Sequence, residues 1–209
     1  MAVFPMFTDL KGKHCVIVGG GQVACRKIEI LQRFEAEITV VALEISSSVE
    51  ELAGTGDVRI FRIPYAEQFI DNAFLVIAAT SDEGVNERVY RDAVKRNIPV
   101  NVADDPQKCT FLFPSVIKRG ALTIGISTSG VYPALSRRIR KITEDIFTEE
   151  YSEIVELLAD FRLKVRKSSL ERAEREKLLG KVLEDFYREG IITGQALRNI
   201  LDCAEIPER

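Results

Sequence analysis

Three glycines stand in a row early in the chain, where a short apolar run ends. Gly19, Gly20 and Gly21 open the pattern G-x-G-x-x-A, which closes at Ala24. Between a strand and a helix, the first glycine of this pattern makes a tight turn and the second lets the backbone approach a pyrophosphate. Unpaired N–H groups at the start of the helix then attract the phosphates. The pattern predicts a dinucleotide site that uses Gly19 and Gly21, and the alternative is a glycine-rich turn that binds nothing.

Two further positions belong to this predicted site. The acidic residue that binds the adenine ribose is expected about 20 residues after the glycine turn, and Glu44 follows the apolar run 38–43. Its alternative role is a solvated loop carboxylate. Ala79 and Thr80 end another apolar run, where small residues allow a nicotinamide ribose to pass close to the backbone. Because no arginine directly follows 38–43 to receive a 2′-phosphate, the sequence favours NAD over NADP.

A pair of carboxylates stands at the end of the apolar run 98–103. Asp104 follows the run directly, and Asp105 is its neighbour. Ligands of open α/β sheets collect outside the carboxyl ends of strands, and repulsion between two carboxylates can raise the pKa of one of them. A raised pKa suits a general base, so Asp104 is the predicted catalytic residue. The alternative is an Asx turn before Pro106.

The segment 106–143 is basic although the whole chain is slightly acidic. It holds seven Lys and Arg residues and no Asp or Glu, whereas the whole chain has 29 basic and 32 acidic residues. This asymmetry indicates an anionic partner. A small polycarboxylate or polyphosphate fits better than nucleic acid, because no nucleic-acid-binding motif appears. The alternative is a solvated helix face that packs on nearby acidic residues, across a dimer or within the chain.

Four residues of this segment are the candidate substrate contacts. Arg137 and Arg138 supply positive charge, and Ser127 and Thr128 belong to a hydroxyl-rich turn that leads to Pro133. Proline is favoured as a first helical residue, and backbone N–H groups at such a helix start can bind carboxylates. The alternative is that the hydroxyls only cap the helix.

Strand and helix patterns alternate through the first 127 residues. Continuous apolar runs are typical of buried parallel strands, and amphipathic stretches between them are typical of helices. The runs lie at 14–18, 38–43, 58–63, 74–79, 98–103 and 122–127, and the helical patterns at 22–34 and 83–96. We therefore expect an α/β fold with a Rossmann-type parallel sheet. From 133 onward the pattern is helical, with a long first stretch over 133–167.

Composition excludes several other classes of protein. The chain has 209 residues, of which 46% are hydrophobic and 29% charged, as in ordinary globular proteins. No stretch approaches the roughly 20 apolar residues of a membrane span, and the first ten residues show no secretory signal. The four cysteines form no C-x-x-C pair and His14 is the single histidine, so no metal site is predicted. We expect a cytoplasmic protein with no membrane or nucleic-acid partner.

Short motifs along nearly the whole chain match one known family. They lie at 5–7, 9–13, 16–24, 26–27, 78–80, 85–86, 101–104, 113–120, 122–124 and 126–128, and at the single positions 130, 133, 135 and 140. With these motifs the chain resembles the siroheme-synthase N-terminal family. Its members are precorrin-2 dehydrogenases with or without sirohydrochlorin ferrochelatase activity.

The resemblance implies NAD-dependent oxidation of precorrin-2 to sirohydrochlorin by a homodimer whose active site uses both chains. It implies a Rossmann domain over 1–113, a dimerisation and substrate segment over 114–145, and a helical C-terminal domain over 146–209. A tetrapyrrole fringed with carboxylates fits the basic segment. The site residues that the family pattern implies are Asp104 as catalytic aspartate, Gln22, Val23, Leu43 and Glu44 as NAD contacts, and Thr128 in the tetrapyrrole site.

The chain departs from the family pattern at two positions. Tyr132 stands where serine is common and Ser136 where alanine is common. The chain ends without the methyltransferase domain of fused members, which indicates a stand-alone form. The resemblance leaves open whether Fe(II) or Co(II) is inserted into the product, and whether the product leads to siroheme or cobalamin. Two competing functions are an NAD-sensing binding module and an oxidoreductase for another anionic substrate.

Overall fold

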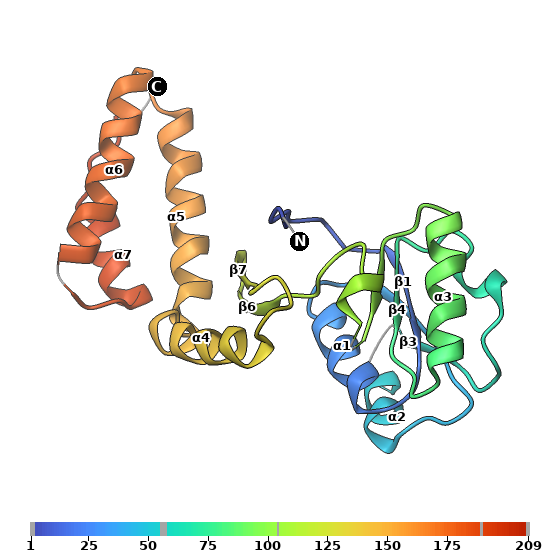
Figure 1. Cartoon of the computed structure of the whole chain (residues 1–209). Coiled ribbons are helices and arrows are strands. Elements are labelled where there is room, and N and C mark those ends of the chain that lie inside the picture. The colour runs from blue at the N-terminus through green and yellow to red at the C-terminus, as the bar shows by residue number, and fades with distance from the viewer. Residues whose placement is uncertain (1–2, 55–57, 104, 189, 208–209) are drawn as a thin grey trace. The chain divides into compact units, whose positions relative to one another are not determined.

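The computed structural model describes residues 3–54, 58–103, 105–188 and 190–207. The chain divides into two compact units (Figure 1). One unit is Met1–Pro114 with Ser127–Pro133, and the other is Ser115–Ile126 with Ala134–Arg209. The three-part division at 113 and 145 stays a prediction.

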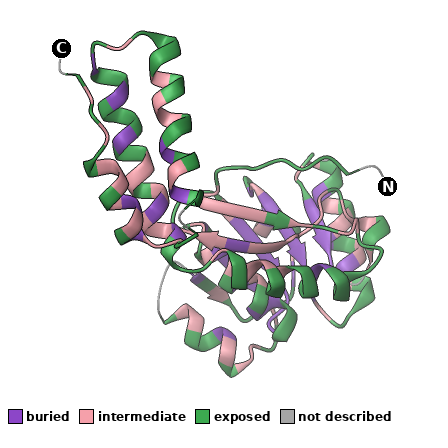
Figure 2. Ribbon diagram, turned by 90° about the vertical axis from the view of Figure 1, so that its left-hand side faces the viewer, coloured by how far each residue is buried: buried purple, intermediate pink, exposed green. Residues whose placement is uncertain are grey.

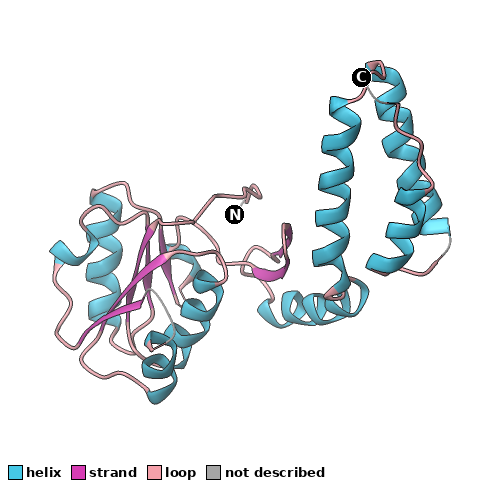
Figure 3. Ribbon diagram, turned by 180° about the vertical axis from the view of Figure 1, so that it is seen from behind, coloured by secondary structure: helices cyan, strands magenta, loops and turns pink. Residues whose placement is uncertain are grey.

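The first unit is built on a parallel sheet of five strands in the order β3-β2-β1-β4-β5. Figure 3 shows this sheet in magenta, with helices packed beside it. Val18 lies opposite Val41 and Ala78, and Ala78 lies opposite Val102, so the strands end at one level. The strands are β1 (His14–Val18), β2 (Glu37–Val41), β3 (Val58–Phe61), β4 (Leu75–Ala78) and β5 (Val100–Val102). The predicted Rossmann-type sheet is confirmed. Its strand order reverses direction between β1 and β4, which is where ligands of such sheets bind.

Helices cover both faces of this sheet. On one face lie α1 (Gln22–Gln32) and α2 (Ser47–Ala53), and on the other lie α3 (Glu83–Lys95) and the 3-10 helix η1 (Glu67–Ile70). Alternate side chains of β1 therefore pack into two hydrophobic cores, one on each face of the sheet. Ile17 packs in the core under α1, and Val16 packs in the core under α3. Figure 2 shows the strands of this sheet mostly in the colour of buried residues. Burial on both faces explains why the strands are continuous apolar runs.

The run 122–127 was predicted as a sixth strand, and the strand is confirmed, but it is not part of the parallel sheet. It forms β7 (Leu122–Ile126), which pairs antiparallel with β6 (Ser115–Arg119) in a separate two-stranded sheet. A parallel partner is usually joined through a crossover α-helix, but the short 3-10 helix η2 (Pro106–Lys108) is the only helix described between β5 and β6. Gly120, with φ +54°, instead starts a two-residue turn that forms a hairpin locally.

The second unit is otherwise helical. Its helices are α4 (Pro133–Ile146), α5 (Glu150–Lys167), α6 (Arg172–Arg188) and α7 (Gly194–Asp202). The helical stretch predicted over 133–167 is broken after Ile146, where the Phe147 carbonyl accepts from the Arg119 guanidinium at 3.0 Å. Phe161, Phe186 and Leu197 form the core of α5, α6 and α7. None of the described helices is both long and apolar enough to cross a membrane.

Candidate functional site

The three glycines between β1 and α1 lie in different surroundings, and only the first two are required by packing within the described chain. Gly19 has φ +128°, a conformation that L side chains rarely adopt, and a Cβ there would overlap the Ala79 carbonyl. Gly20 lies against the loop after β2, where a Cβ would overlap the carbonyl of Glu44. The turn is therefore packed tightly between the loops that follow β2 and β4.

Gly21 differs from its two neighbours. Its φ of −91° is open to any residue, and a Cβ there would meet no described atom within 4 Å. Packing within the described chain therefore gives no reason for glycine at this position. Gly21 is also the N-cap of α1, which has no described side-chain cap and no acidic residue in its first turn. An open helix start with bare backbone is the arrangement that accepts a diphosphate, so these residues fit a dinucleotide.

The loop after β2 lies directly beside this turn. The Ser46 N–H donates to the Gly20 carbonyl at 2.9 Å. Leu43 is 68% exposed and Glu44 is exposed. Gln22 and Val23 are also exposed in the first turn of α1, and the Gln22 amide lies 3.5 Å from the Ser48 hydroxyl. The structure thus brings the four predicted adenosine-side and diphosphate-side contacts to one edge of the sheet.

The loop after β4 closes the other side of the turn. The Ala79 N–H donates to the Val18 carbonyl at 2.7 Å. The backbone N–H and carbonyl of Thr80 both bond to the Asn86 side chain, at 3.2 and 3.0 Å. The Thr80 hydroxyl is paired within the same turn, 2.9 Å from both Asn86 Oδ1 and the Asp82 carbonyl. The N–H, carbonyl and hydroxyl groups of Thr80 are therefore already hydrogen-bonded within the chain. A ligand would contact Thr80 by packing against it.

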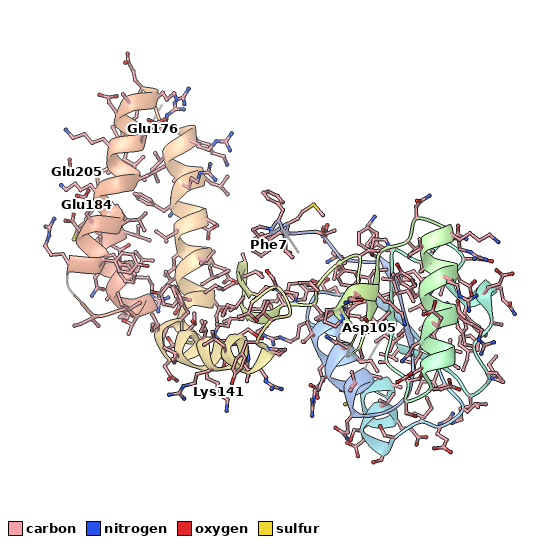
Figure 4. All side chains as sticks on the ribbon, viewed as in Figure 1. Phe7, Asp105, Lys141, Glu176, Glu184 and Glu205 are labelled. Atoms are coloured by element: carbon pink, nitrogen blue, oxygen red, sulfur yellow. The ribbon has the colours of Figure 1, made fainter. Side chains whose placement is uncertain are left out.

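Asp104, the predicted catalytic residue, lies outside the described residues. Its neighbour Asp105 is described and labelled in Figure 4. The Asp105 carboxylate accepts from the Gln107 N–H at 3.2 Å and pairs with Lys108 at 3.1 Å. Lys108 holds the pKa of Asp105 below its usual value. The Asx turn before Pro106 is thus made by Asp105, whose pKa is lowered and not raised.

The hydroxyl-rich turn before α4 lies in the first unit. Ser127 Oγ accepts from the Ser129 N–H at 3.0 Å, and Thr128 Oγ1 accepts from the Tyr132 N–H at 3.3 Å. A Cβ on Gly130 would lie 3.6 Å from Pro106, so the turn lies beside η2 at the carboxyl end of β5. Both hydroxyls therefore support the turn itself, and they lie near the part of the chain that follows Asp104.

The two predicted arginines lie in the second unit. Arg137 and Arg138 are exposed on α4, and Lys141 projects from the same helix (Figure 4). The four predicted substrate residues are therefore divided between the two units.

His14 lies at the opposite edge of the sheet. Its Nε2 is 2.9 Å from Thr39 Oγ1, and burial lowers its pKa, so it is neutral near pH 7. A hollow at this edge is lined by His14, Thr39, Lys11 and Glu35, of which the last two form an ion pair at 2.6 Å. It adjoins the amino ends of the strands, away from the glycine turn. The described residues hold no group of three or more His, Cys, Asp or Glu side chains that could bind a metal.

Comparisons with known proteins define the class. Residues 6–115 match the family described as putative NAD(P)-binding, and the chain belongs to this family. It is also 37% identical over 214 residues to the siroheme synthase of Pseudoalteromonas translucida, covering 100% of this chain and 45% of that protein. The siroheme synthase of Methylobacillus flagellatus is 34% identical over 195 residues, 93% of this chain and 42% of that protein. The chain spans about half the length of these curated relatives.

One solved structure matches over its whole length. It is SirC, precorrin-2 dehydrogenase, with 27% sequence identity and a TM-score of 0.76, covering 96% of this chain and 100% of that chain. These matches confirm the resemblance to the siroheme-synthase family that the short motifs indicated.

Proposed function

We propose that this chain is an NAD-dependent dehydrogenase that oxidises precorrin-2 to sirohydrochlorin. The observation that carries the proposal is the open helix start at Gly21, in a chain similar over its length to a precorrin-2 dehydrogenase. The siroheme synthases among its relatives support the same substrate class.

The reaction removes one hydride and one proton from the substrate. When bound, NAD supplies the hydride acceptor. The backbone at Gly19 and Gly21 holds the diphosphate, and Leu43 and Glu44 lie on the adenosine side. Ala79 and Thr80 form the surface for the nicotinamide half. Asp104 takes the proton as general base and passes it to solvent.

The substrate carries several carboxylates, and the basic residues of the second unit are their proposed partners. Arg137 and Arg138 are exposed on α4 and supply positive charge. Ser127 and Thr128 keep a turn in shape beside η2, and we propose that the backbone of this turn and Tyr132 contact the edge of the substrate. Tyr132 is 62% exposed, which leaves its ring available for such a contact.

A homodimer through α4 is part of the proposal. Leu135, Ile139, Ile142 and Ile146 recur at helical spacing and are 47%, 38%, 48% and 60% exposed. An apolar stripe of this kind on a charged helix is typical of an interface. Light scattering of the parent and of Ile142→Asp tests it: we expect a dimer that the charged variant converts to monomer. A monomeric parent at micromolar concentration contradicts the proposal.

The activity test follows the product directly. The chain is incubated with precorrin-2 and NAD, and the expected result is the sirohydrochlorin spectrum with NADH formed in equal amount. NAD binding without turnover would instead support the sensing module. Turnover of a different anionic substrate would support the other oxidoreductase. The same incubation with Fe(II) or Co(II) tests metal insertion, and the cytoplasmic location stays a prediction from the sequence.

A further inference from the structure

One buried amide side chain holds the loop after β4 in place. Asn86 lies in α3 and is 9% exposed. All described hydrogen bonds of its side chain go to one residue, Thr80: Oδ1 accepts from the Thr80 N–H at 3.2 Å, and Nδ2 donates to the Thr80 carbonyl at 3.0 Å. Oδ1 also lies 2.9 Å from the Thr80 hydroxyl. The amide thus holds both backbone groups of a single residue.

The residue that Asn86 holds forms one wall of the glycine turn. A Cβ on Gly19 would overlap the Ala79 carbonyl and lie 3.1 Å from the Thr80 nitrogen. The backbone of 79–80 is therefore in direct contact with the backbone of the diphosphate turn.

Thr80 lies on the side of the turn away from the adenosine contacts. Leu43 and Glu44 follow β2, which pairs with one edge of β1, whereas Thr80 follows β4, which pairs with the other edge. A dinucleotide crosses such a sheet at this reversal of strand order, with the adenine ribose on the β2 side. The nicotinamide half therefore falls on the β4 side, against 79–80.

The bonding pattern explains the need for an amide at this position. Only a side chain with a donor and an acceptor can satisfy the N–H and the carbonyl of Thr80 together. Aspartate keeps the acceptor and loses the donor, and leucine loses both. Buried backbone groups left without a partner are costly, so the loop would shift to find new partners.

We infer that Asn86 is a positioning residue that fixes the Thr80 backbone as the wall for the nicotinamide half of the dinucleotide. This inference rests on the proposed use of NAD and adds a residue to it. Asn86 acts through Thr80 and touches neither reactant.

The test compares two ligands that share the adenosine diphosphate part. Calorimetric titration with NAD and with ADP is carried out on the parent, Asn86→Leu and Asn86→Asp. We expect Asn86→Leu to weaken NAD binding by about tenfold or more and to leave ADP binding within about twofold. Asn86→Asp, which keeps the acceptor and is close in shape, should fall between and remains informative if the leucine variant does not fold.

A matched control separates positioning from stability. Asp82→Ala removes the cap of the same helix, whose carboxylate accepts from the Gly84 and Val85 N–H groups, and leaves the Asn86 bonds intact. It should lower the melting temperature without changing the ratio of NAD to ADP affinity. An equal loss of both ligands in the Asn86 variants, no loss of NAD binding, or the same ratio change in Asp82→Ala would overturn the inference.

The parent protein distinguishes this inference from the proposed function. If the parent binds NAD and its binding depends on Asn86 but precorrin-2 is not oxidised, the proposed function fails and the role of Asn86 stands. A parent that binds no NAD overturns both.

Discussion

Two helices begin at the same edge of the sheet, and their starts differ. The start of α3 is closed, because Asp82 caps it with bonds of 2.8 and 3.1 Å to the Gly84 and Val85 N–H groups. The start of α1 is open, with Gly21 as its N-cap and no described side-chain cap. Free N–H groups and the positive end of the helix dipole are therefore available at α1 alone of these two. The difference indicates which of two similar turns receives an anion.

The largest expected effect comes from Asp104 and distinguishes NAD binding at the start of α1 from catalysis. Asp104→Ala removes the proposed base but leaves the α1 turn unchanged. We expect turnover with precorrin-2 and NAD to fall about 10²- to 10⁴-fold, with NAD affinity unchanged by calorimetry. Asp105→Asn serves as the neighbouring control and should change turnover little. A loss of less than about threefold in Asp104→Ala would remove Asp104 from the mechanism, since positioned bases contribute far more.

Gly21→Asp makes the start of α1 resemble that of α3. Its backbone conformation suits an aspartate cap, and a Cβ there meets no described atom. The new carboxylate would occupy the helix start and repel phosphate, so NAD affinity should fall about 100-fold. Stability should stay equal or rise by a few tenths of a kcal/mol, because Asp is only slightly better than Gly as an N-cap. Urea unfolding and NAD titration measure the two effects, and unchanged NAD binding would contradict the assignment of the site.

Asp82→Ala makes the opposite change. The α3 start loses its cap, which should cost about 1 kcal/mol of unfolding free energy. NAD affinity should stay the same, because this helix start is not a phosphate site. Urea unfolding gives the first quantity and calorimetry the second. A gain or loss of NAD affinity would show that the two helix starts are not independent.

The smallest expected effect concerns the third turn at this edge, which Asp105 closes. Lys108 lowers the pKa of Asp105 in the folded protein from its usual 3.8. The group is therefore more acidic when folded, and its contribution to stability is present at neutral pH and lost as the pH falls through 3.8 and below. The urea midpoints of the parent and of Asp105→Asn should differ at pH 7, and this difference should shrink as the pH falls below 3.8. A constant difference over this range would contradict the Asp105–Lys108 pairing.

The sheet and its glycine turn could be predicted because their signals are local. A buried parallel strand such as β1 is a continuous apolar run, and a glycine series marks its end. The shared carboxyl edge then follows from the parallel arrangement, which brings Glu44 and Thr80 to the sides of the glycine turn. These relations need no knowledge of contacts between distant residues.

Other features depend on relations that the apolar pattern does not show. The run that forms β7 looks like the strands of the sheet, and only the two-residue turn at Gly120 identifies a hairpin. At the break between α4 and α5, the Phe147 carbonyl accepts from Arg119, which stands 28 residues earlier in the chain. The hydrogen bonds between Asn86 and Thr80 could be identified only from distances in the structure. The sequence does not show them, because an asparagine in a helix has many alternative partners.

The three adjacent glycines would respond differently to selection. Variants at Gly19 and Gly20 collide with the chain itself, so a screen for folded protein alone would discard them. Variants at Gly21 would survive that screen and be lost only when growth depends on the enzyme. A descendant that no longer binds the cofactor would therefore keep Gly19 and Gly20 but accumulate substitutions at Gly21. The residue at position 21 thus indicates whether a nucleotide is bound, independently of folding.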